Sequence, residues 1–141
     1  NRNNLKHPFR DDILIAVSGP VSNLLLAALL VLALKILLSL VTFASAETFE
    51  IVVGTFLVFI SLNVSLGLFN LLPIPPLDGS HILGNLLSLK SAGTSATFFK
   101  YGSFLLIAIV AAERILNIDI LPIGRAVNAV VSAMLRLVGL G

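Results

Sequence analysis

Residues 69–81 read FNLLPIPPLDGSH, and this stretch decides how the chain is organised. Three of the four residues Pro73–Pro76 are prolines, which exclude a regular helix because proline lacks a backbone N–H and clashes with the preceding turn. Asp78 follows, and it is the only acidic residue between Glu50 and Glu113. A carboxylate in so apolar a setting is costly unless a cation, a metal or a proton neutralises it. We therefore interpret Asp78 as part of a functional site on a proline-broken segment.

The overall composition is that of an integral membrane protein. Of the 141 residues, 57% are hydrophobic and 11% are charged, whereas a soluble domain is about 25% charged. At membrane depth, irregular backbone survives only where protein buries it or a water-filled cavity meets it, so the proline segment is expected to line a cavity. The net charge of +2 is small and dispersed, and we expect no nucleic-acid partner. The absence of cysteine excludes disulfides, thiolate zinc sites and cysteine nucleophiles.

Long apolar runs predict an all-α fold, a polytopic bundle of membrane helices with a break at Pro73–Pro76. We expect one membrane domain over 1–141 with these parts: a polar lead-in at 1–12, a first helix region at 13–43, a second helix at 51–71, the site segment and a short helix at 73–89, a third helix at 98–116 and an amphipathic helix at 123–138. Gly19 and Pro20 predict a short turn at 13–18 before a spanning helix over about 20–42, because proline fits a first helical turn. The small polar residues 90–97 predict a loop.

The last helix carries a polar stripe on one face, formed by Arg125, Asn128, Ser132 and Arg136. The helix either lies in the membrane interface or spans the bilayer with the stripe turned toward protein.

Basic residues predict the orientation in the membrane. They lie before the first helix and beside the third, at Arg2, Lys6, Arg10, Lys90 and Lys100. The loop at 44–50 contains no Lys or Arg. By the positive-inside rule, the N-terminal tail and the Asp78 side are expected in the cytoplasm.

Four side chains are candidates for chemistry, and each has a plainer alternative. Asp78 is either a turn or helix N-cap residue, or a metal ligand, since carboxylate oxygen is an ordinary zinc donor. His81 stands three residues later and could lie on the same side of the short helix as Asp78. It would be a second ligand or support the site, or its position is incidental. A metal site that also includes His7 is the weakest alternative. Asn23 and Asn70 each lie near a helix break, and either amide could instead join neighbouring helices.

Two sequence motifs resemble those of the site-2 protease family of intramembrane zinc metalloproteases. Residues 70–79 resemble the family's N-x-x-P-x-P-P-L-D-G signature, and residues 19–23 resemble its G-P-x-x-N motif. Residues 4–12 are similar to the polar lead-in of the compact prokaryotic branch without a PDZ domain. The resemblance covers about residues 1–90, and the remainder matches only as generic membrane helices.

The resemblance implies an activity and a role for each site residue. Asp78 would be the third protein ligand of one catalytic Zn²⁺, and Asn23 and Asn70 would hold the scissile peptide or the oxyanion. The substrates would be transmembrane segments of other proteins in the lipid bilayer. The resemblance also implies an integral protein of the prokaryotic cytoplasmic membrane whose site faces the cytoplasmic side.

One element of the family pattern is absent from this sequence. The family's other zinc ligands and its general base come from H-E-x-x-H on an earlier helix, and no His-Glu dipeptide occurs in these 141 residues. The chain begins at Asn1 rather than Met, and we expect it to be the C-terminal portion of a longer protease. The alternative is a non-catalytic relative or a transporter-like membrane module in which Asp78 is a proton or cation site.

Overall fold

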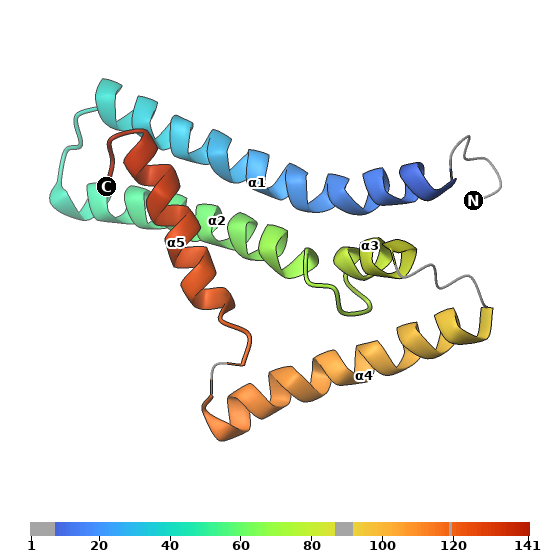
Figure 1. Cartoon of the computed structure of the whole chain (residues 1–141). Coiled ribbons are helices and arrows are strands. Elements are labelled where there is room, and N and C mark those ends of the chain that lie inside the picture. Colours follow the sequence, from blue (N-terminus) through green and yellow to red (C-terminus); the bar gives the residue numbers. More distant parts are fainter. Residues whose placement is uncertain (1–7, 87–91, 119) are drawn as a thin grey trace. The chain divides into compact units, whose positions relative to one another are not determined.

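The computed structural model describes residues 8–86, 92–118 and 120–141 (Figure 1). Every regular element in this part of the chain is an α-helix, and the prediction of an all-α fold is confirmed. The helices are α1 (Pro8–Leu40), α2 (Ala46–Asn70), α3 (Asp78–Leu86), α4 (Ala92–Leu116) and α5 (Ile123–Leu137). They form two compact units, one built from described residues within 1–20 and 69–122, the other from 21–68 and 123–141.

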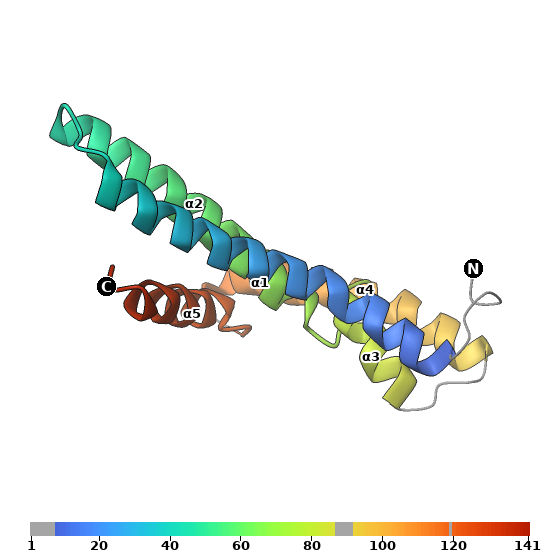
Figure 2. The same ribbon diagram turned by 90° about the horizontal axis from the view of Figure 1, so that it is seen from above.

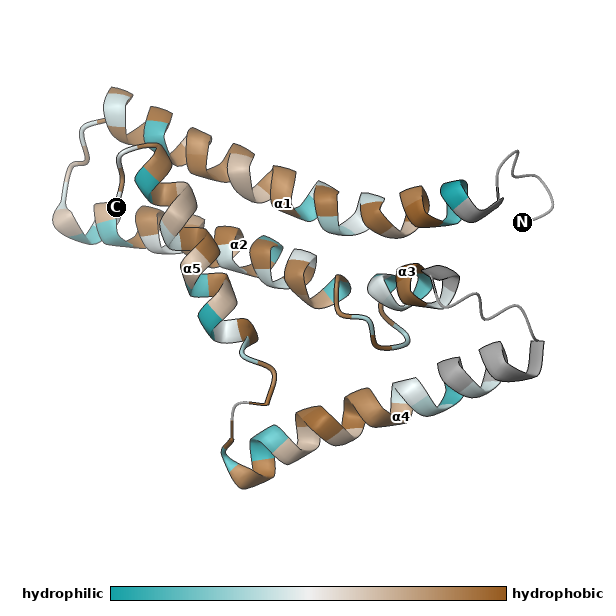
Figure 3. Ribbon diagram, viewed as in Figure 1, coloured by the Kyte–Doolittle hydropathy of each residue, from teal (hydrophilic) through white to brown (hydrophobic). Residues whose placement is uncertain are grey.

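Two of the described helices are long and apolar enough to cross a membrane, α1 over Arg10–Leu40 and α2 over Ala46–Asn70. Figure 3 shows hydrophobic residues around most of both helices. Large side chains such as Leu25, Leu29 and Ile36 are exposed, as expected for surfaces that contact lipid tails. A third spanning helix, within α4, stays a prediction.

Helix α1 is continuous through Gly19 and Pro20, so the predicted turn at 13–18 is wrong. Membrane helices tolerate an interior proline where neighbouring groups satisfy the backbone, and Pro20 is fully buried here. The predicted loop at 90–97 is also wrong for residues 92–97, which are helical in α4. Small polar residues disfavour a helix by less than about 1 kcal/mol each, and this weak preference for a loop did not prevent residues 92–97 from joining α4. Residues 90 and 91 lie outside the described residues.

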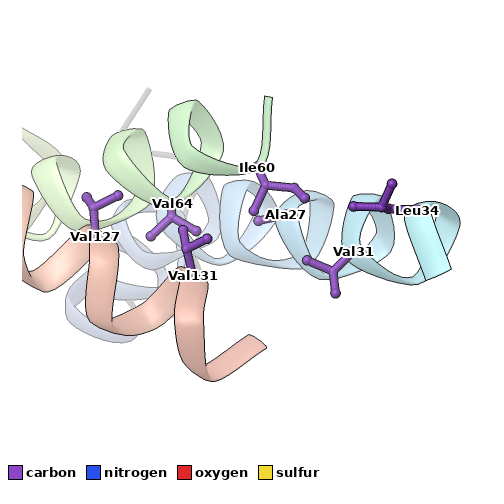
Figure 4. Packing of buried hydrophobic residues seen from close by; sticks show 7 residues of the cluster. All are labelled: Ala27, Val31, Leu34, Ile60, Val64, Val127 and Val131. Atoms are coloured by element: carbon purple, nitrogen blue, oxygen red, sulfur yellow. The ribbon is translucent and has the colours of Figure 1, made fainter. Parts of the chain in front are cut away.

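The second unit has an apolar core shared by three helices. The parts of α1 after Pro20 and of α2 before Phe69 run side by side in opposite directions (Figures 1 and 2). Figure 4 shows the buried cluster, to which all three helices contribute: Ala27, Val31, Leu34, Ile60, Val64, Val127 and Val131. Mostly small and β-branched side chains let the helices approach closely.

Helix α5 turns its apolar face to this core and its polar stripe away from it. Arg125, Asn128, Ser132 and Arg136 are all exposed, whereas Val127 is buried. The 15 residues of α5 span ~22 Å, less than the ~30 Å hydrocarbon core of a bilayer. These observations favour the interfacial alternative over a spanning helix with an inward stripe.

Candidate functional site

The site segment begins where α2 ends. Helix α2 stops at Asn70, and residues 71–77 form turns and bends before α3 begins. The N–H of Leu72 donates to the carbonyl of Phe69 at 3.0 Å, and the N–H of Leu77 donates to that of Ile74 at 3.0 Å. Pro75 lies inside this second turn and is fully buried. The prolines therefore end one helix and shape a compact turn, in the first unit, that leads into the next helix.

Asp78 is the first residue of α3 and is half-buried. Ser80, which is fully buried, closes the preceding turn by donating to the Leu77 carbonyl from its hydroxyl at 2.6 Å and from its N–H at 3.0 Å. Within residues 8–86, 92–118 and 120–141, no hydrogen bond or ion pair reaches the Asp78 carboxylate. Asp78 therefore does not cap α3, and its oxygens remain available to a ligand.

Gly19 in α1 lies directly against this carboxylate. A Cβ atom at Gly19 would be 3.0 Å from Oδ2 of Asp78, tighter than most real contacts. The structure thus brings together Asp78 of the proline motif and the glycine of the G-P-x-x-N motif, within the same compact unit. The sequence predicts a turn at Gly19 and places it in a motif, but it predicts no contact with Asp78. One signal in the sequence could have indicated this contact, namely a glycine beside a proline inside a long apolar run. A glycine in such a position often allows another group to approach the helix backbone closely.

The two asparagines lie in different units. Asn70 is half-buried at the end of α2, in the same unit as Asp78, whereas Asn23 is half-buried on α1 in the other unit. Among the described residues neither amide forms a hydrogen bond, unlike Asn63, whose Nδ2 donates to the carbonyl of Phe59 at 2.8 Å. The structure thus shows no bond that would assign either asparagine to helix packing.

The described residues supply one candidate metal ligand rather than a full set. They contain no group of three His, Cys, Asp or Glu side chains able to hold a metal ion. Asp78 fits zinc by its chemistry, since an unbonded carboxylate oxygen is a zinc donor. His81 is exposed on α3, and His7 lies outside the described residues. A supporting role for His81 stays a prediction.

Glu113, a half-buried acid of the same unit, has a bonding partner away from Asp78. The carboxylate of Glu113 accepts a hydrogen bond from the backbone N–H of Leu121, which holds the turn that follows α4. Among the described residues, Glu113 forms no ion pair with the neighbouring Arg114. Adjacent residues of a helix do not face each other.

An apolar groove of about 500 Å³ borders the proline segment on its α4 side. Its wall combines the segment with one face of α4: Pro73, Ile74, Pro75, Thr97, Tyr101, Gly102 and Leu105. The lining residue nearest to Asp78 along the sequence is Pro75, three residues before it.

The long apolar helices and the unbonded Asp78 carboxylate are features of a membrane protein with a polar site. Comparison with known families identifies the class of protein. Residues 35–112, over half of the chain and including the entire 70–79 motif, match the family described as Peptidase family M50. The chain belongs to this family, that of the site-2 proteases, and the resemblance seen in the sequence is confirmed.

A curated relative points the same way. "Putative zinc metalloprotease YwhC" of Bacillus subtilis (strain 168) is 34% identical over 110 residues, which are 76% of this chain and 50% of the relative. The chain thus spans about half the length of the curated relative it matches. No solved structure matches the chain. The family and the two long apolar helices together indicate an integral membrane protein.

Proposed function

We propose that this chain supplies the third zinc ligand, Asp78, to an intramembrane metalloprotease that hydrolyses peptide bonds in transmembrane segments of other membrane proteins. The observation that carries the proposal is the half-buried Asp78 carboxylate, which no described protein group bonds and which lies against Gly19. Membership of the M50 family and the name of the Bacillus subtilis relative support the reaction class. The remaining ligands and the general base would come from an H-E-x-x-H helix, a motif absent from these 141 residues.

Asp78 suits a catalytic rather than a structural zinc. Catalytic zinc takes three protein ligands and leaves a position for water or substrate. When bound, zinc lowers the pKa of its water toward 7 and polarises the carbonyl that is attacked. Asp78 would orient the ion from the first turn of α3, where the buried Ser80 fixes the backbone.

The proline segment would hold the substrate beside this ligand. A transmembrane helix must unwind locally before a protease can cut it, and an extended peptide pairs with backbone groups that no helix uses. Residues 71–77 provide such backbone, and the apolar groove beside them would accept side chains of the unwound segment. Asn70 and Asn23 would donate to the scissile peptide or to its oxyanion.

The proposed setting is the prokaryotic cytoplasmic membrane, with the site open to the cytoplasmic side. The basic residues before α1 and near the start of α4 support this orientation, because positive charge is retained in the cytoplasm.

The test compares Asp78→Asn with Glu50→Gln in the full-length protein, since Glu50 is an exposed carboxylate on α2. Asp78→Asn should keep the thermal midpoint but lose zinc and most cleavage of a transmembrane substrate, because a neutral amide is a poorer zinc ligand. Glu50→Gln should change neither. Expressed alone, the 141-residue chain should hold less than stoichiometric zinc. Normal turnover in Asp78→Asn, or stoichiometric zinc in the isolated chain that depends on Asp78, would contradict the proposal.

A further inference from the structure

Gly102 is the point at which α4 meets the proline segment. A Cβ atom at Gly102 would lie 2.5 Å from Cδ, 2.7 Å from Cγ and 3.0 Å from Cβ of Pro75. Real Cβ atoms essentially never approach other atoms within 3.0 Å, so a larger residue at position 102 must displace one of the two elements. The ring of Pro75 is fully buried and is bonded to its own backbone nitrogen, so it cannot rotate away as a flexible side chain would.

The stretch from Pro75 to Asp78 has little room to absorb such a displacement. The turn that contains Pro75 is closed by the Leu77 N–H bond to the Ile74 carbonyl, at 3.0 Å. The Leu77 carbonyl in turn accepts two hydrogen bonds from the fully buried Ser80. On the far side of Asp78, a Cβ atom at Gly79 would collide with the carbonyl oxygen of Leu71. Movement at Pro75 is therefore transmitted to Asp78.

We propose that Gly102 is a positioning residue for Asp78. Because Gly102 has no side chain, Pro75 seats directly against α4, and the seated turn holds the Asp78 carboxylate at Gly19. The expected effect on catalysis rests on the proposed function, whereas the expected effect on the position of Asp78 follows from packing alone.

The displacement sets the size of the effect. To move from 2.5 Å to an ordinary contact of 3.4 Å or more, Pro75 must shift by about 1 Å in Gly102→Ala, if α4 stays in place. Misplacement of a reacting group by 1 Å can lower a rate ~10²-fold. In the full-length protein, Gly102→Ala should therefore cleave its substrate ~10²-fold more slowly and bind zinc more weakly. Gly54→Ala is the matched control, because a Cβ atom at Gly54 meets nothing within 4 Å.

A cross-link between Gly19→Cys and Asp78→Cys reports the position of residue 78 without reference to activity. The sequence contains no other cysteine, and disulfides form readily only when the Cβ atoms lie about 3.5–4.5 Å apart. The cysteine pair should oxidise readily in the full chain in membranes. Adding Gly102→Ala should slow its oxidation several-fold, whereas adding Gly54→Ala should not.

Rescue separates positioning from general damage to the fold. Pro75→Ala removes Cγ and Cδ, the two atoms nearest to position 102. If direct contact is the cause, the double variant Gly102→Ala/Pro75→Ala should cross-link like Pro75→Ala alone, and it should fold even if Gly102→Ala does not. Parental cross-linking in Gly102→Ala, or independent and additive defects in the double variant, would overturn the proposal. Cross-linking as expected in a protein that cleaves no transmembrane substrate would uphold the positioning role and refute the proposed function.

Discussion

Replacing Gly19 by alanine and then by valine tests whether α1 supports the Asp78 carboxylate directly. In Gly19→Ala the new Cβ atom would lie 3.0 Å from Oδ2, so the carboxylate must retreat by a few tenths of an ångström. Since 1 Å of misplacement can cost ~10²-fold, this smaller shift should lower zinc affinity and turnover roughly three- to tenfold. Valine adds two methyl groups to the same Cβ atom, and Gly19→Val should lose ~10²-fold.

Stability should move in the opposite direction for the alanine variant. Alanine is favoured over glycine in a helix interior by about 1 kcal/mol, and Gly19 lies inside the continuous α1. Gly19→Ala should therefore keep or raise the thermal midpoint while it loses function, so unfolding cannot explain the loss. Gly54→Ala and Gly54→Val are matched controls in α2, where a Cβ atom meets nothing within 4 Å.

The assay measures two quantities for each variant of the full-length protein in detergent: zinc affinity by competition with a chelator, and cleavage of a transmembrane substrate. Wild-type values for both in Gly19→Val would refute the contact between α1 and Asp78. Equal losses in the Gly54 variants would show that membrane-helix glycines are generally sensitive, and would also remove the support for a specific contact.

Three further predictions address the candidate site residue Asn70, the core and the topology. Asn70→Ala should lower kcat/KM by about 10²-fold with little change in thermal midpoint, as when one oxyanion donor is lost. If Asn70 only packs helices together, the substitution would instead lower the stability by roughly 0.6–2 kcal/mol and leave the cleavage rate unchanged. Ile60→Ala should destabilise the second unit by about 2 kcal/mol, the low end for a core truncation because lipid also solvates apolar groups. Val58→Ala should have little effect, since the Ile60 side chain is 0% exposed and that of Val58 57% exposed. Equal thermal midpoints for the two variants would contradict the core assignment. Single cysteines at Glu47 and Lys90 should react with an impermeant thiol reagent from opposite sides of the membrane, and labelling from one side would break the two-helix topology.

Local sequence rules predicted the elements that depend on a few adjacent residues. Helix α2 ends at Asn70 and α3 begins at Asp78, so the three prolines within Pro73–Pro76 lie between two helices. A helix does not continue through them, because several missing N–H groups in one turn cannot be compensated. The single Pro20 had the opposite outcome, and α1 runs through it. One lost hydrogen bond can be offset by burial against neighbours, and the neighbours are known only from the fold.

Composition and motif order alone determined that the chain is an all-α membrane protein of the site-2 protease family, and they singled out Asp78 as a candidate site residue. A lone acid among apolar residues and a run of prolines can be recognised from the sequence without coordinates. Tertiary structure alone decided that Gly19 lies against the Asp78 carboxylate and that Pro75 seats on Gly102. These contacts join segments that are far apart along the chain. In a sequence, a glycine indicates only that some group comes close to the backbone. Which group arrives depends on how the helices pack, and that is a property of the folded chain rather than of any local pattern.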